Sequence, residues 1–149
     1  MPTKLIASGG ASVSSCVKAK RTTDLTVPQN IKTVIPFDSE EFDTDELHDN
    51  TTNNTRITIK KTGVYVVLGQ GAYEANTSNQ RYLYLYKNGV EYDGAKFMPS
   101  SSGSTSTFCS FSMYLEAGDY IELYAYHTST AANLLLYGAT ASFSAMLVG

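Results

Sequence analysis

The chain has 149 residues, 42% of them hydrophobic, which fits a single globular domain and argues against an intrinsically disordered chain. Its net charge of −3 is small, and its few basic residues are not interleaved with aromatic residues, which excludes a nucleic-acid-binding pattern. No apolar stretch approaches the ~20 residues that span a membrane, and no signal peptide follows Met1, so we expect cytoplasmic synthesis without export or membrane contact.

The composition predicts strands. The chain contains 11 Tyr and 6 Phe, which favour half-buried pleated surfaces, and no helical period continues beyond two turns. Alternating segments first occur over residues 16–21 and 33–37, where Pro28 and Pro36 restrict strands to edges or ends.

The middle of the chain carries the clearest strand signals. Residues 56–60 alternate, and residues 64–71 form a nearly continuous apolar run that suits a strand covered on both faces. Residues 81–87 alternate again and are followed by Asn88 and Gly89, which together predict a type I′ hairpin turn. On this strand Leu83 and Leu85 face one way and the tyrosines the other.

The last third contributes further short strands, over residues 104–115, 120–126, 134–137 and 141–148. Eight to ten short strands at regular spacing, without helices, predict an all-β sandwich or barrel.

Several of these segments resemble the jelly-roll superfamily of tumour necrosis factor (TNF) and the complement globular head. The similarity lies in residues 63–67, 84–89, 115–123 and 143–147, and it extends over about residues 33–149. The resemblance implies a jelly-roll sandwich of about ten antiparallel strands that assembles as a compact homotrimer around aromatic residues.

A narrower resemblance concerns residues 42–49 and 58–65, which look like free-standing bacteriophage proteins of this superfamily. The chain has no collagen-like stalk and no membrane anchor. We therefore expect the fold and the trimer to carry over, but not the cytokine and complement roles.

Aromatic residues are the expected trimer contacts, because three copies of a ring bury a large area around an axis. The alternative is that exposed rings bind sugars. The trimer-interface candidates are Tyr82, Tyr84, Tyr86, Phe108, Phe111, Tyr114, Tyr124 and Tyr126.

Catalysis and metal binding have little support. The acidic stretch that includes Asp43, Asp45 and Asp49 offers carboxylates to calcium, but its spacing is not that of an EF-hand, and a hydrated surface is the preferred interpretation. His48 and His127 are the only candidate bases near neutral pH, and no nucleophile motif accompanies them. We expect neither an enzyme nor a cofactor.

Charge suggests an attachment segment. The first 37 residues hold five basic residues and one acidic residue, whereas the remainder hold six basic and 13 acidic ones. We expect an arm over residues 1–32, with or without the first strand, and the jelly roll over residues 33–149. The arm's anchoring candidates are Leu5, Ile6, Lys18, Lys20 and Arg21.

These features predict a trimeric capsid decoration (cement) protein on a phage head, with itself and the major capsid protein as partners. One alternative is the host-receptor head of a fibre or tail, which would bind cell-surface glycan. The other is a secreted adhesion module, which would need an export signal.

Overall fold

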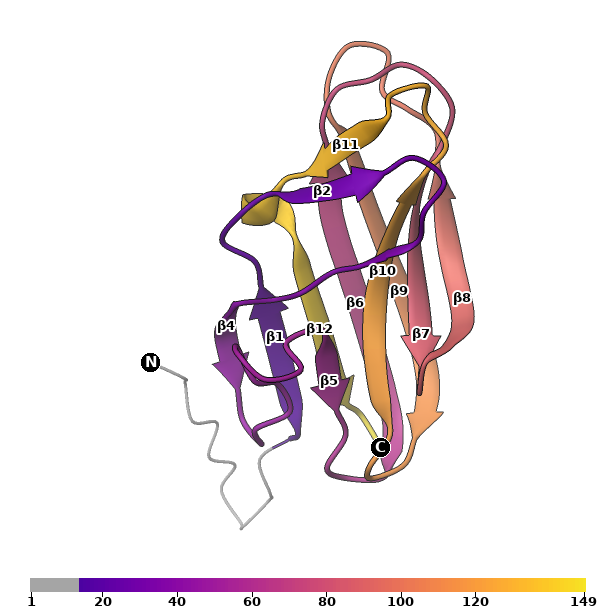
Figure 1. Cartoon of the computed structure of the whole chain (residues 1–149). Coiled ribbons are helices and arrows are strands. Elements are labelled where there is room, and N and C mark those ends of the chain that lie inside the picture. Colours follow the sequence, from indigo (N-terminus) through magenta and orange to yellow (C-terminus); the bar gives the residue numbers. More distant parts are fainter. Residues whose placement is uncertain (1–13) are drawn as a thin grey trace.

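The structure, a computed structural model, describes residues 14–149 as two antiparallel sheets packed face to face (Figure 1). The seven-stranded sheet, called sheet A, consists of β1 (Cys16–Lys20), β2 (Leu25–Pro28), β4 (Ser39–Asp43), β6 (Gly63–Tyr73), β9 (Thr105–Leu115), β11 (Asn133–Leu136) and β12 (Ser142–Leu147). The five-stranded sheet, called sheet B, consists of β3 (Thr33–Val34), β5 (Arg56–Thr58), β7 (Arg81–Lys87), β8 (Val90–Phe97) and β10 (Tyr120–His127). A short 3₁₀ turn, η1 (Gly138–Thr140), precedes β12. The predicted all-β sandwich is confirmed.

The core lies between the two sheets, and each long strand contributes to it the side chains on one of its two sides. On sheet B, Leu83 of β7 is paired with Ala125 of β10, and Leu85 is paired with Leu123; all four side chains are fully buried. The tyrosines alternate with them and face outward, as the sequence predicts. On the opposite layer, Phe143 of β12 lies 5.7 Å, centroid to centroid, from the ring of Phe37.

The β7–β8 hairpin has the predicted turn. Asn88 and Gly89 have φ angles of 50° and 79°, so both central residues are left-handed, as a type I′ turn requires. The turn brings β8 back along β7 at the end of sheet B.

The central strand β6 departs from the prediction. It pairs with β9 along its whole length and with β12, and its alternate residues are buried against sheet B. On its other side Val64 and Leu68 are exposed, because no second layer formed by residues 14–149 covers the outer face of sheet A. The expectation of burial on both faces is therefore wrong for the single chain.

The jelly roll also begins earlier than expected. Strand β1 lies inside sheet A, between β12 and β4, with Cys16 paired to Met146 from the opposite end of the chain. Residues 16–28, which the expected arm included, thus contain two strands of the sandwich. The remaining part of the expected arm, residues 1–13, lies outside the described residues. Within residues 14–149, no helix is long and apolar enough to cross a membrane.

Candidate functional site

The eight aromatic candidates for a trimer axis do not share one surface. Five tyrosines, on β7 and β10, face outward from sheet B, whereas Phe108 and Tyr114 on β9 face outward from sheet A. Phe111 has the opposite orientation on β9 and packs half-buried against the core. One axis cannot be lined by both outer faces of a sandwich, so the set is wrong as a single interface. Local alternation could not show this, because it does not reveal which sheet a strand joins.

The outer face of sheet A is the candidate association surface. Five large apolar side chains on β6, β9 and β12 are between 40% and 67% exposed there: Val64, Leu68, Phe108, Tyr114 and Met146. The strand register places Tyr114 beside Val64 and Met146 beside Val66, and it places Ser110 and Ser144 on either side of Leu68. Large apolar side chains gathered on one exposed face mark contact sites. Sequence reasoning found the two β9 residues and missed the three others.

A shallow groove of about 260 Å³ extends this face over β1 and β12, between Phe42, Leu68 and Met146. At its rim, Glu41 binds both basic residues of β1: its Oε2 lies 2.9 Å from Lys18 Nζ and 3.8 Å from Lys20 Nζ. These two anchoring candidates are therefore already paired within their own sheet.

Arg21, the third basic candidate, also serves the fold. Its guanidinium donates to the carbonyl oxygens of Pro36 at 2.7 Å and of Asp24 at 3.2 Å. Burial lowers its pKa. Leu5 and Ile6 lie outside the described residues.

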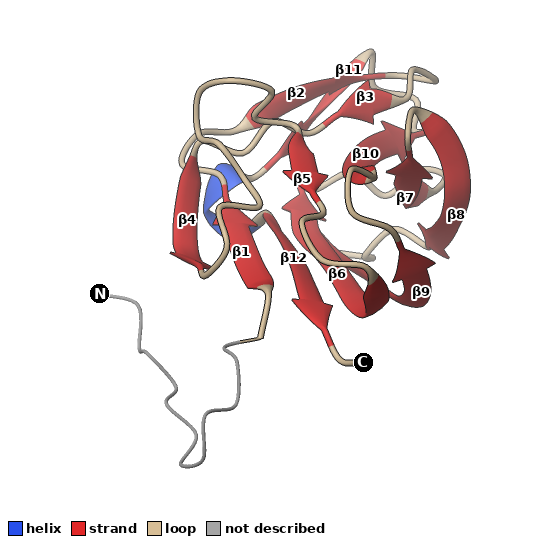
Figure 2. Cartoon of the chain, turned by 90° about the horizontal axis from the view of Figure 1, so that it is seen from below, coloured by secondary structure: helices blue, strands red, loops and turns tan. Residues whose placement is uncertain are grey.

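One edge of the sandwich is also apolar. Strands β8 and β9 end their respective sheets at the same side, and within the described part of the chain each pairs with a neighbour on one side only (Figure 2). Tyr92 and Met98 are exposed there, and Phe97 contacts Phe108 with 6.4 Å between ring centroids. The edge thus continues the exposed apolar area of sheet A.

The outer face of sheet B carries stacked tyrosines. Tyr86 and Tyr124 stack at 3.9 Å between ring centroids, and Tyr82 and Tyr84 stack at 5.6 Å. Tyr126 contacts the second pair edge-on, at 5.3 Å from Tyr82. Burial raises the pKa of Tyr84, Tyr86 and Tyr124, so these hydroxyls keep their protons at neutral pH.

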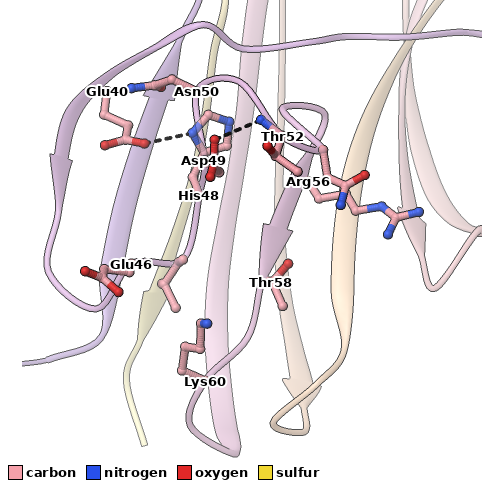
Figure 3. Close-up of a pocket in the computed structure, with 11 residues that line it drawn as sticks. Glu40, Glu46, His48, Asp49, Asn50, Thr52, Arg56, Thr58 and Lys60 are labelled. Carbon is pink, nitrogen blue, oxygen red and sulfur yellow. Dashed lines mark hydrogen bonds and ion pairs between the residues drawn. The ribbon is translucent and has the colours of Figure 1, made fainter.

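A polar hollow of about 720 Å³ lies between β4 and β5 (Figure 3). Its wall is held by Asp43, whose carboxylate accepts the backbone N–H groups of Asp45, Leu47 and His48 at 2.9–3.3 Å. The His48 ring is fixed between Glu40, 3.0 Å from Nδ1, and a backbone carbonyl. His48 is thus held in place by hydrogen bonds within its loop.

The three acidic metal candidates are each used locally. Asp43 holds the loop, Asp45 accepts a hydrogen bond from Ser15 and pairs with Lys61 at 3.3 Å, and Asp49 accepts the N–H groups of Thr51 and Thr52. Hydrogen bonds from Thr52 and Thr51 lower the pKa of Asp49. Within residues 14–149 no three His, Cys, Asp or Glu side chains are grouped so as to hold a metal ion.

His127, the other candidate base, is fully buried at the far end of sheet B. Its Nε2 lies 2.8 Å from the Val27 carbonyl oxygen and its Nδ1 lies 2.9 Å from Ser129 Oγ. Beside it on β7, Arg81 is also fully buried, with its guanidinium bound to carbonyl oxygens of residues 76–79. Sequence reasoning missed this buried cation. The expectation that the chain is not an enzyme stays a prediction.

Cys109 is buried, and burial raises the pKa of its thiol to about 11. The thiol therefore stays protonated and packs as a small apolar side chain.

No protein-family model matches the chain, and no curated protein matches its sequence. Solved structures do share its fold. The globular domain of zebrafish complement 1qA superposes with a TM-score of 0.68 at 16% identity, covering 92% of this chain and 98% of that one. Murine APRIL superposes with a TM-score of 0.66 at 10% identity, covering 91% of this chain and 100% of that one. The Eiger TNF of S. frugiperda superposes with a TM-score of 0.63 at 14% identity, covering 91% of this chain and 93% of that one.

The chain is therefore a jelly roll of the TNF and complement globular-head type. The resemblance seen in the sequence is confirmed at the level of the fold. None of these three structures is described as a bacteriophage protein, so the phage origin stays a prediction.

Proposed function

We propose that the protein is a homotrimeric structural protein of a bacteriophage particle, in which copies associate through the outer face of sheet A and decorate the head. The apolar face formed by β6, β9 and β12 is the observation that supports self-association. The phage assignment rests on the sequence resemblance of residues 42–49 and 58–65. The major capsid protein is the proposed partner of the assembled trimer.

The shape of the two apolar areas favours a ring over a two-fold dimer. The broad patch lies on the face of sheet A, whereas Tyr92 and Met98 lie on the adjoining edge. A face that receives a neighbour's edge makes a head-to-tail contact, and such contacts close into a ring when the rotation between copies permits. In a ring of three copies, each of the three contacts then buries one Leu68 and one Phe108.

Light scattering coupled to size-exclusion chromatography tests the assembly. The wild-type protein is expected to have the mass of three chains. Leu68→Arg places a cation on the apolar face of each copy and should give monomers, since a buried unpaired charge costs several kcal/mol. Ile31→Arg, which charges an exposed apolar residue outside this face, should remain a trimer. A wild-type monomer at micromolar concentration would refute the assembly.

Attachment to the head is proposed to use residues 1–12, since Lys18, Lys20 and Arg21 already have partners in the fold. A variant lacking residues 1–12 is expected to form the trimer and to be lost from purified particles. Immunogold labelling of intact particles is expected on the head. Labelling confined to the tail tip would favour host recognition over head decoration as the function. A truncated trimer that still covers heads would refute the attachment role of residues 1–12.

A further inference from the structure

Tyrosine is concentrated on one surface of this molecule. Six of the 11 tyrosines lie on the outer face of sheet B, at alternate positions of β7 and β10: Tyr82, Tyr84, Tyr86, Tyr120, Tyr124 and Tyr126. The antiparallel register pairs Tyr82 with Tyr126 and Tyr84 with Tyr124. We call these six residues the tyrosine row. The core residues of both strands lie on the opposite side.

The hydroxyl groups of the row are largely free. Among the described residues, only the Tyr86 hydroxyl donates to a protein group, the Glu91 carboxylate at 3.4 Å. None of the other five is a buried atom without a partner, so solvent reaches them. The row therefore combines half-buried aromatic rings with hydroxyl groups that can donate and accept hydrogen bonds.

The row has little net charge of its own. Lys32 lies over the Tyr84 ring, 4.4 Å from its centroid, and is paired with Glu91. Arg56 lies 3.9 Å from the Tyr120 centroid and 4.0 Å from Glu122. Because both cations over the rings have carboxylate partners, this face does not favour an anionic ligand such as nucleic acid or a sulfated glycan.

The polar hollow adjoins this row. Thr58 on β5 is paired with Tyr120 on β10, and both Arg56 and Thr58 line the hollow. Its other lining groups include amide side chains at Asn50 and Asn53, which make no hydrogen bond within the described residues. At about 720 Å³ it falls in the range of ligand sites, roughly 300–1,000 Å³. Figure 3 shows Glu46 and Lys60 among the residues that line the hollow.

We propose that the tyrosine row and the adjoining hollow bind a neutral oligosaccharide. Sugar rings alternate apolar C–H groups, which pack against aromatic rings, with hydroxyls, which phenol groups can bind, and the row offers both kinds of group. Tyrosine suits this role because its ring is amphipathic and loses little conformational entropy on binding. The asparagine amides in the hollow can donate and accept at once, as neighbouring sugar hydroxyls require.

This site is independent of the proposed assembly and of the capsid location. It lies on sheet B, and the apolar association face lies on the opposite sheet of the sandwich, so binding can be tested whether or not trimers form. A protein ligand would use the same tyrosines, and the experiment separates the two cases.

The test begins with the full-length protein on an array of immobilised neutral and acidic oligosaccharides. The best neutral glycan is then titrated in solution by calorimetry. Tyr84→Ala and Tyr124→Ala should each weaken binding at least about tenfold, as expected for a central aromatic contact. Tyr92→Ala removes an exposed tyrosine outside the row and should change the affinity less than twofold.

A second pair of variants covers the case in which an alanine variant fails to fold. Tyr84→Phe and Tyr124→Phe keep the stacked rings and delete only the hydroxyls, and each should weaken binding by about three- to tenfold. Failure of every neutral glycan to bind, binding to acidic glycans alone, or equal effects of Tyr84→Ala and Tyr92→Ala would overturn the proposal. Array failure together with capture of a purified particle protein by the row would show that the surface contacts protein.

Discussion

The side chain of Asn88 should contribute much more to stability than its position in an exposed hairpin turn suggests. Its Nδ2 donates to Asp119 Oδ1 at 2.8 Å, and its Oδ1 accepts the Tyr120 N–H at 2.9 Å. The two bonds tie the β7–β8 turn to the turn that precedes β10. The hydrogen bond from Asn88 is also the first cause that holds the pKa of Asp119 below its usual range.

Asn88→Gly removes both bonds and keeps a residue that accepts the φ of 50°. A bond to a charged group contributes about 1.5–3 kcal/mol and a neutral one about 0.5–1.5 kcal/mol, and exposure favours the lower values. We therefore expect a loss of about 2 kcal/mol, which corresponds to a fall in Tm of about 4–8 °C for a domain of this size. Asn88→Ala should lose about 1 kcal/mol more, because alanine is strained at positive φ.

Urea denaturation at pH 7 and pH 3 measures this prediction, and Asn30→Gly is the matched control. Asn30 is also left-handed, with φ of 58°, but its side chain makes no hydrogen bond within the described residues. The stability that Asp119 gains from its lowered pKa is present above pH 3.8 and is lost as the pH falls through its folded-state pKa. The difference between wild type and Asn88→Gly should thus shrink at pH 3. Equal effects of Asn88→Gly and Asn30→Gly would refute the reasoning.

Three further predictions concern buried positions. Arg81→Met leaves the carbonyl groups of residues 76–79 without their donor and should cost about 3 kcal/mol, measured by urea denaturation. Burial lowers the pKa of His127 below 6.5, so stability should be complete above pH 6.5 and fall as the pH drops through the folded-state pKa; His127→Gln should flatten this part of the profile. Gly138→Ala places a Cβ 2.1 Å from the Thr23 carbonyl oxygen and should cost at least about 2 kcal/mol, whereas Gly103→Ala, with open space around it, should melt like wild type.

Local chemistry made the hairpins predictable. The turn at Asn88 and Gly89 follows from the φ preferences of two residues, and the burial of Leu83 and Leu85 follows from the period of a strand. Neither requires knowledge of the rest of the chain. Because these features depend only on neighbouring residues, the resemblance to the fold could also be seen in these segments.

Long-range pairing was not predictable in this way. Strand β1 joins the sheet because Cys16 pairs with Met146, and no pattern around residue 16 reveals a partner at the other end of the chain. The buried Arg81 is equally hidden, since its acceptors are backbone carbonyl groups that any residue provides. The apolar run of β6 predicts that both faces of the strand are buried. The sequence does not reveal whether the second face is buried by the same chain or by another one.

The two proposed surfaces predict a measurable link between assembly and binding strength. Association through sheet A would leave three tyrosine rows facing outward, and simultaneous engagement can raise avidity about 10²–10⁴-fold over a single site. Leu68→Arg should therefore keep the wild-type affinity for a soluble oligosaccharide and lose about 100-fold or more in retention on a glycan-coated surface. Tyr124→Ala should lose both. If Leu68→Arg also lost the soluble ligand, the two faces would not be independent, and the assignment of one to assembly and the other to recognition would be wrong.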